Sequence, residues 1–138
     1  MKLSGTPVKG QAGFMLIEVL ISVLIFSVGV LALVGLQSSM TRAQTESKVR
    51  ADASYLAGEL VGLMWTDPKN LAGFSDSSCA STPQCADWKA KVVQLLPTAV
   101  SSVVVTAATG RVSITLRWTL AGGTQHQYTT TTTVAINP

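Results

Sequence analysis

The most apolar stretch of the chain reads FMLIEVLISVLIFSVGVLALVGL and occupies residues 14–36. Eighteen of its 23 residues are Ala, Val, Ile, Leu, Met or Phe, and the only charged residue among them is Glu18. As a helix that rises ~1.5 Å per residue, the stretch would extend roughly 35 Å, enough to cross the hydrocarbon core of a bilayer. The sequence therefore predicts a transmembrane helix over residues 14–36.

The residues before this stretch, MKLSGTPVKGQAG at positions 1–13, are mostly small and polar, with two lysines and no acidic residue. Pro7 and the small residues disfavour a helix or a strand here. We therefore interpret residues 1–13 as a leader peptide that takes no part in the fold.

The residues after the apolar stretch predict that the same helix continues through residues 37–66, because no proline occurs between Phe14 and Asp67. From Gln37 onward the pattern becomes amphipathic. Its apolar face, expected to cover the rest of the protein, is formed by Val49, Ala53, Leu56, Leu60 and Leu63. The opposite face carries a stripe of small residues: Ala51, Ser54, Gly58 and Gly62.

Residues 67–138 predict a small globular head. The first part, residues 67–98, is rich in turn-forming residues and is expected to be irregular, with one short helix near residues 84–96 that ends at Pro97. The apolar residues of that helix expected to share one face are Trp88, Val92, Leu95 and Leu96.

The last part, residues 99–138, predicts a β-meander. Residues 111–120 alternate between apolar and polar side chains, the pattern of a half-buried antiparallel strand. The apolar positions of this strand are Val112, Ile114, Leu116, Trp118 and Leu120. Glycines at positions 110, 122 and 123 provide turns, and residues 100–107 and 125–136 form the flanking strands. The expected fold is α+β: a long N-terminal helix packed on a small antiparallel sheet of three to four strands.

Composition limits the functional classes. The chain has 138 residues, enough for one domain, with a hydrophobic fraction of 47% and a charged fraction of 12%, which excludes intrinsic disorder. Of ten basic residues, Lys2 and Lys9 precede the apolar stretch, so eight basic against seven acidic residues remain, a poor basis for nucleic-acid binding. Two cysteines and one histidine are too few for a typical metal site unless carboxylates join them.

The junction between the leader and the apolar stretch resembles a known signature. The segment GFMLIEVL at residues 13–20 is similar to the cleavage site of type IV prepilins: glycine, phenylalanine, and a glutamate four residues later. The continuation FSVGVLALVGLQ at residues 26–37 resembles PilV-type minor pilins in particular. Many major pilins carry a proline within the helix, whereas this chain has Gly29 and Gly35, so no proline kink is carried over.

The resemblance implies a processing and assembly pathway. A prepilin peptidase would cut between Gly13 and Phe14 and methylate the new amine of Phe14. The protein would pass once through the bacterial inner membrane with its head in the periplasm, and then join a type IV pilus on the cell surface. Its partners would be that peptidase, the membrane, and other minor and major pilins. Neither catalysis, a cofactor, a nucleic acid nor a small-molecule substrate is expected.

Glu18 is the most informative single residue, because a carboxylate inside a spanning segment is costly. We expect it to pair with the ammonium of Phe14, within one subunit or between neighbours; the alternative is that it reaches the lipid headgroups.

Cys79 and Cys85 enclose five residues in a turn-rich segment, and an extracytoplasmic location permits a disulfide between them. The alternative is two free buried thiols, since the spacing matches no redox or zinc motif.

Other interpretations remain open at this point. The N-terminal region also fits a secretory signal peptide or a plain membrane anchor, and the closest functional alternative is a minor pseudopilin of the GspI type in a type II secretion system. Arg111 and Arg117 on one strand face are thin evidence for a DNA-binding pilin. Gly58 and Gly62 are either tolerated helix glycines or a packing face for a neighbouring subunit. We interpret Trp65, Trp88 and Trp118 as core residues, and His126 as packed or exposed on a strand.

Overall fold

The computed structural model describes residues 12–134, so most of the leader expected at residues 1–13 and the end of the last expected strand lie outside the described part. The element order is α1, two short 3-10 helices (η1 and η2), α2 and three strands, β1 to β3. The chain divides into two compact units, Met1–Ala43 and Gln44–Pro138, and helix α1 contributes to both. This is an α+β arrangement, as the sequence predicts.

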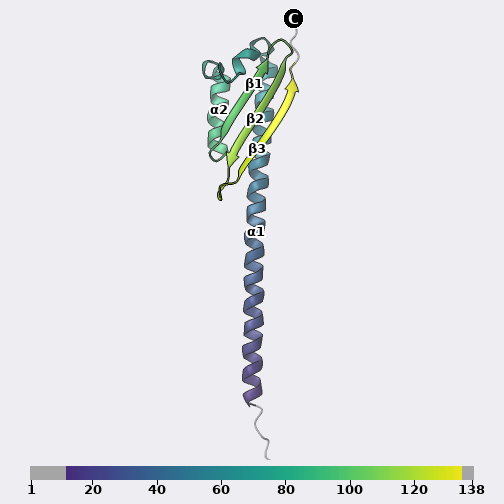
Figure 1. Ribbon diagram of the computed structural model, residues 1–138, viewed down its shortest axis with the longest axis vertical. Helices are drawn as coiled ribbons and strands as arrows, with labels where there is room; N and C mark the ends of the chain where they lie inside the picture. The colour runs from purple at the N-terminus through teal and green to yellow at the C-terminus, as the bar shows by residue number, and fades with distance from the viewer. Residues whose placement is uncertain (1–11, 135–138) are drawn as a thin grey trace, which may run out of the picture. The chain divides into compact units, whose positions relative to one another are not determined.

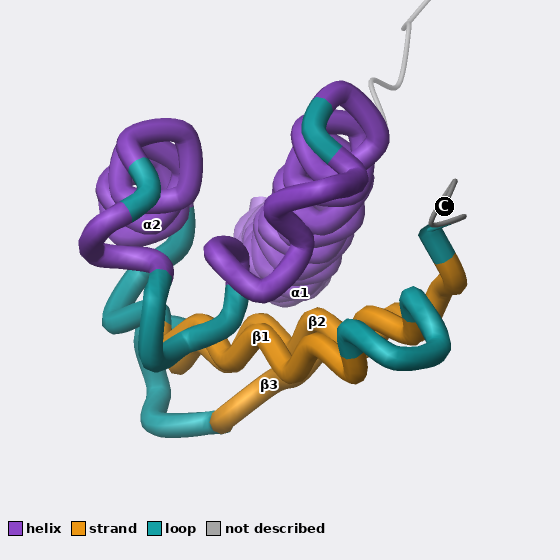
Figure 2. The backbone as a smooth tube through the Cα atoms, turned by 90° about the horizontal axis from the view of Figure 1, so that it is seen from above, coloured by secondary structure: helices purple, strands orange, loops and turns teal. Residues whose placement is uncertain are grey.

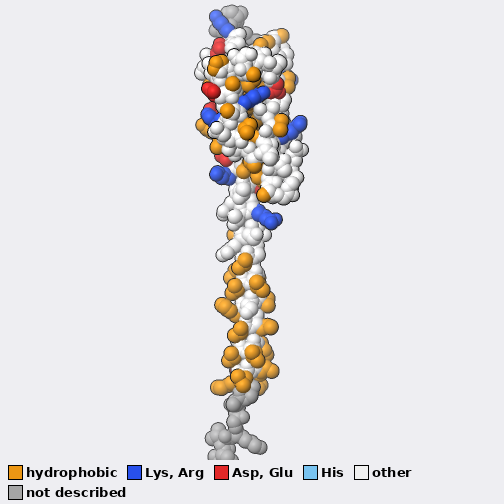
Figure 3. Space-filling model, turned by 90° about the vertical axis from the view of Figure 1, so that its left-hand side faces the viewer, with side chains coloured by type: hydrophobic (Ala, Val, Ile, Leu, Met, Phe, Trp, Pro, Cys, Tyr) orange, Lys and Arg blue, Asp and Glu red, His pale blue; other side chains and the backbone are white. Residues whose placement is uncertain are grey.

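The first unit consists, within the described residues, of the N-terminal part of α1 (Ala12–Thr66). Every side chain from residue 14 to residue 43 is exposed. Hydrophobic side chains cover the visible face of this part of the helix in Figure 3. The helix is long and apolar enough to cross a membrane. Because a helix that is apolar on all sides is stable only in lipid or against other protein surfaces, this part of α1 requires one of these environments.

In the second unit, the C-terminal part of α1 has a buried stripe that differs slightly from the predicted one. The buried residues are Val49, Ala53, Leu56, Ala57, Leu60 and Met64. Leu63, which was expected in the stripe, is only half-buried. Each residue turns the helix by about 100°, so Met64 lies about 40° from the direction of Leu60, whereas Leu63 lies about 60° away. Met64 therefore takes the inward position.

The segment after α1 is more regular than predicted. It contains η1 (Pro68–Phe74) and η2 (Cys79–Ser81), followed by α2 (Pro83–Leu95). Helix α2 is close to its expected position, but the prediction that Leu95 belongs to its buried face is wrong, because Leu95 is 47% exposed. Cys85 joins Trp88 and Val92 on the buried face instead, and Leu96 is buried just after the helix ends.

The sheet is an antiparallel meander of three strands in the order β1-β2-β3 (Figure 1). The strands are β1 (Val100–Thr106), β2 (Arg111–Thr119) and β3 (Gln125–Thr133). The register pairs Val103 with Ile114 and Ile114 with Thr130. Gly110, at the β1–β2 turn, has φ 66°, a left-handed conformation that glycine adopts without strain.

Helices α1 and α2 lie on the same face of the sheet (Figure 2). On that face the alternating residues of β2 are buried as predicted: Val112, Ile114, Leu116 and Trp118. Trp88 of α2 connects the two helices, because its Nε1–H donates to the carbonyl of Leu56 of α1 at 2.8 Å. Trp88 and Trp118 are thus core residues, but Trp65 is 50% exposed. The prediction for Trp65 is wrong because the residue follows inward-facing Met64 and points about 100° away from it.

Candidate functional site

The predicted cleavage site lies at the very start of α1. Within the described residues the helix begins at Ala12, so both Gly13 and Phe14 belong to the first described turn. The N–H groups of a first helical turn have no acceptor within the helix, and this turn unwinds more easily than the rest. The Phe14 side chain is 75% exposed. A peptidase that requires an extended substrate therefore has to unwind only one turn at this position.

Glu18 lies four residues after Phe14, one turn farther along α1. Three polar side chains occur between residues 14 and 36: Glu18, Ser22 and Ser27. The two serines satisfy their hydroxyl groups on the helix itself, since Ser22 donates to the carbonyl of Glu18 at 2.8 Å and Ser27 to that of Val23 at 2.7 Å. Within the described part of the chain, no cation lies within ion-pair distance of the Glu18 carboxylate. Glu18 is therefore the one polar side chain of this segment without a partner in residues 12–134.

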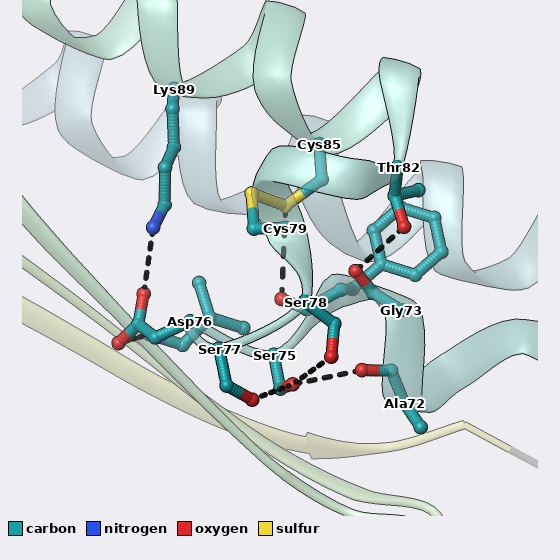
Figure 4. Close-up of a disulfide and its surroundings, with 12 residues drawn as sticks. Ala72, Gly73, Ser75, Asp76, Ser77, Ser78, Cys79, Thr82, Cys85 and Lys89 are labelled. Atoms are coloured by element: carbon teal, nitrogen blue, oxygen red, sulfur yellow. Dashed lines mark hydrogen bonds and ion pairs between the residues drawn. A yellow bond between two sulfur atoms is a disulfide. The ribbon is translucent and has the colours of Figure 1, made fainter.

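Cys79 and Cys85 form a disulfide in the second unit, with their Cα atoms 5.1 Å apart and both residues fully buried. The bond connects η2 to the first turns of α2 (Figure 4). Between the two cysteines, Thr82 donates its hydroxyl to the carbonyl of Gly73 at 2.8 Å. At Gly73 a β-carbon would lie 2.7 Å from the Thr82 hydroxyl, so the close approach requires glycine. The disulfide and this contact hold the turn-rich segment to α2.

Asp76 connects the same segment to the sheet and was not identified from the sequence. Its carboxylate accepts hydrogen bonds from Lys89 at 3.0 Å, from the Ser102 hydroxyl at 3.0 Å and from the Val103 N–H at 2.9 Å. Partial burial tends to raise the pKa of Asp76, but these three hydrogen bonds together hold it below the ordinary value. No sequence signal could show this, because the donors lie 13 to 27 residues away.

A second ion pair joins the two helices of the second unit. Lys91 of α2 binds the carboxylate of Glu59 of α1, and this hydrogen bond raises the pKa of Lys91. A shallow depression of about 210 Å³ surrounds the pair, lined by Glu59, Leu63, Gln84, Asp87, Trp88 and Lys91. The Glu59–Lys91 ion pair thus connects α1 and α2 on their outer side, and the hydrogen bond from Trp88 to Leu56 connects them on the inner side.

The remaining predicted features lie on exposed surfaces or against the sheet. His126 stacks on Trp118, with ring centroids 5.9 Å apart, so it packs on a strand as expected. Arg111 and Arg117 are exposed, on the face of β2 opposite to its buried residues. Gly58 and Gly62 are exposed, and a β-carbon at either would contact nothing within 4 Å. Packing inside the second unit therefore does not require these two glycines.

Among residues 12–134, no three His, Cys, Asp or Glu side chains come together in a way that could hold a metal ion. Compared with the known protein families, with curated proteins and with solved structures, the chain matches none of them.

Proposed function

We propose that this protein is a minor pilin. In this proposal a prepilin peptidase cleaves the chain between Gly13 and Phe14 on the cytoplasmic side of the inner membrane and methylates the new amine. The apolar part of α1 holds the protein in the membrane with the second unit in the periplasm. The protein then enters a type IV pilus and helps to start or assemble it together with other minor and major pilins.

The observation that carries the proposal is the state of Glu18. A carboxylate in an apolar segment is maintained only where something compensates its charge. The two neighbouring serines are satisfied by the helix, whereas Glu18 has no partner in the described part of the chain. A partner that appears only after processing or only in an assembly explains this arrangement.

Processing supplies such a partner. Cleavage after Gly13 converts the amide of Phe14 into an ammonium, four residues or one helical turn from Glu18. Methylation of the amine leaves its positive charge in place. When the apolar segments of several subunits pack together, both charges enter an environment of low polarity, and each neutralises the other within a subunit or between neighbours.

The exposed apolar part of α1 supports the same mechanism. All side chains of residues 14–43 lie on the surface of the isolated chain. In the membrane, lipid covers the most apolar of them, and in a filament the helices of neighbouring subunits replace the lipid. The function is assembly, and the residues that perform it are those of α1.

The test compares Glu18→Ala with Ser22→Ala. Both changes remove one polar group from the same segment, but the Ser22 hydroxyl bonds only to its own helix. We expect Glu18→Ala to leave cleavage and membrane insertion largely intact and to reduce the amount of protein in sheared pili more than about tenfold, since breaking a buried ion pair costs about 3–5 kcal/mol. Ser22→Ala should remain near the wild-type level.

The mass of the mature N-terminal peptide provides a second measurement. A methylated Phe14 is expected; an intact leader, or a cut in the middle of the apolar segment, would contradict the proposal. Glu18→Ala protein at wild-type levels in sheared pili would contradict the role of the carboxylate. Deletion of the gene should abolish pili and twitching. Normal pili together with secreted enzymes retained in the periplasm would instead assign the protein to a type II secretion system.

A further inference from the structure

The two outer edges of the sheet differ in how they are covered. On the outer edge of β1, the Asp76 carboxylate accepts the Val103 N–H at 2.9 Å, and the Asp76 N–H donates to the Val103 carbonyl at 3.1 Å. The loop therefore occupies the hydrogen-bonding groups in the middle of β1. No further strand can pair with β1 at this position.

The direction of the main-chain groups of β3 follows from the same contact. Residues of an antiparallel pair alternate between bonding to one neighbour and bonding to the other. Because both main-chain groups of Val103 point away from β2, its partner Ile114 bonds to Thr130 of β3. The adjacent residue Thr129 consequently points both groups outward. The β3 residues with outward main-chain groups are Gln125, Gln127, Thr129, Thr131 and Thr133.

Two hydrogen bonds at the ends of the sheet agree with this alternation. Thr119 is an odd-numbered residue of β2, and its N–H donates toward the β1 side, to the carbonyl of Pro97 at 3.3 Å. Val134 is the even-numbered residue just after β3, and its N–H donates toward β2, to the carbonyl of Gly110 at 2.9 Å. Within residues 12–134 no strand pairs with the outer edge of β3, so its outward main-chain groups have no strand partner there.

The edge of β3 lacks the features that normally prevent pairing. Exposed edge strands are usually protected by charged side chains, by proline or by a bulge. The sequence of β3, QHQYTTTTT, contains no Lys, Arg, Asp, Glu or Pro. Its register with β2 runs without a bulge from Thr133 to Gln125. Five consecutive threonines also favour the extended conformation that pairing requires.

We propose that β3 pairs antiparallel with β3 of a second copy of this chain. A two-fold axis at Thr129, the middle of the five outward residues, places Thr129 opposite the partner's Thr129. Thr131 then lies opposite the partner's Gln127, and Thr133 opposite the partner's Gln125. A strand that pairs with itself brings identical residues close to one another, and the absence of charge in β3 removes the repulsion this would otherwise cause. Because the loop covers β1, the joined sheet of two times three strands closes at two copies.

The direction of the strands fixes the geometry of the pair. Within the second unit, the C-terminal part of α1 runs in the same direction as β3 (Figure 1). An antiparallel β3 pair therefore places the C-terminal parts of the two α1 helices in opposite directions. The pairing does not depend on the proposed function.

The test uses the full-length chain in detergent micelles, with the monomer–dimer equilibrium followed by analytical ultracentrifugation. T129K places two ammonium groups face to face at the two-fold axis. T115K is the matched control, because it adds the same charge to the same sheet face and breaks the same Thr115–Thr129 hydroxyl contact of 3.2 Å, but lies on the central strand.

We expect the wild type to form dimers, T115K to dimerise nearly as strongly, and T129K to dimerise at least about tenfold more weakly. T129E should fail in the same way, and a mixture of T129K with T129E should form mixed dimers, which also shows that both variants are folded. A wild-type chain that stays monomeric would overturn the inference. So would dimers of T129K alone, equal loss in T115K and T129K, or capture of a strand from a different protein by this edge. None of these results would bear on processing at Phe14.

Discussion

At the scale of single residues, the most connected side chains receive their partners from distant parts of the sequence. Asp76 joins the turn-rich segment to α2 through Lys89 and to β1 through Ser102 and Val103. Asp76 and Lys89 both remain partly exposed, so the Coulombic contribution of the pair is screened by solvent. The importance of Asp76 therefore comes chiefly from the hydrogen bonds that its carboxylate accepts.

We predict that Asp76 makes the stability of the second unit dependent on pH at the acid end. Its pKa is lowered from the ordinary value of 3.8, so the folded state favours the charged form. The resulting stabilisation is fully present above that value and is lost as the pH falls through the lower pKa of the folded state. Urea unfolding between pH 7 and pH 2 should therefore show a steeper acid loss for the wild type than for Asp76→Asn.

The control for this experiment is Asp87→Asn, which changes an exposed carboxylate of α2. It should retain the acid dependence of the wild type. At pH 7 we expect Asp76→Ala to cost about 1–3 kcal/mol, because the Val103 N–H loses its acceptor. Identical acid profiles for the wild type and Asp76→Asn would show that the carboxylate has no such role.

At the scale of the elements, the phase of α1 decides which residues the core contains. The inward stripe follows the helical repeat to Met64, so Leu63 lies on its flank, beside the Glu59–Lys91 pair. In α2 the repeat does not explain the exposure of Leu95. It lies seven residues after buried Trp88, only about 20° from the direction of that residue, and it is the last residue of the helix. In α1 the departures from the predicted core are Leu63, at the edge of the buried face, and Trp65, which points away from it.

The two leucines of α1 should respond differently to truncation. Leu60 is fully buried, and Leu60→Ala should lower the free energy of unfolding by about 2–5 kcal/mol. Leu63 is half-buried, and Leu63→Ala should cost roughly 1 kcal/mol. Denaturant unfolding of the second unit, followed by the fluorescence of buried Trp88 and Trp118, measures both. Equal losses would show that the stripe runs through Leu63 as well.

The disulfide should stabilise the segment that carries η2. Closing a loop of seven residues is worth about 2 kcal/mol in the chain-entropy description. Alkylation of the exported protein should find no free thiol before reduction and two after it. Cys79→Ser together with Cys85→Ser should lower the unfolding free energy by a similar amount and expose the segment to proteases. Two reactive thiols in the unreduced mature protein would contradict the bond.

At the scale of the whole molecule, the two units have opposite solvent requirements. Residues 14–43 have no buried side chain, whereas Gln44–Pro138 contains every buried residue of the described chain. The compact second unit begins at Gln44, within the amphipathic part of α1. The sequence changes from an all-apolar to an amphipathic pattern seven residues earlier, at Gln37. One helix thus provides both a segment apolar enough to cross a membrane and the cover of a small sheet.

A fragment that begins at Gln44 is therefore expected to fold on its own. It should remain soluble without detergent, form the Cys79–Cys85 disulfide and show a cooperative thermal transition with the near-ultraviolet dichroism of Trp88 and Trp118. The full-length chain should partition into the detergent phase of a phase-separation assay. A fragment without a cooperative transition would show that residues 12–43 are needed for the core.

The sequence by itself determines the elements of this protein, because their signals are local. The long apolar stretch predicts the exposed helix, Pro68 marks its end, and the strict alternation of residues 111–119 predicts β2 and its buried face. Glu18 also stands out from the sequence alone, as the only charge in an apolar segment. Each of these inferences depends on residues within a few turns or one strand.

Tertiary structure alone decides which neighbours meet, because side chains distant in sequence must be placed in three dimensions first. The hydrogen bonds of Asp76, the anchoring of Trp88 to the Leu56 carbonyl and the stack of His126 on Trp118 all depend on the packing of separate elements. The same holds for the two sheet edges, since only the fold shows that a loop covers β1 while no strand among residues 12–134 pairs with the outer edge of β3. Pattern and periodicity specify a residue's face, but the partner on that face depends on how the helices and strands pack.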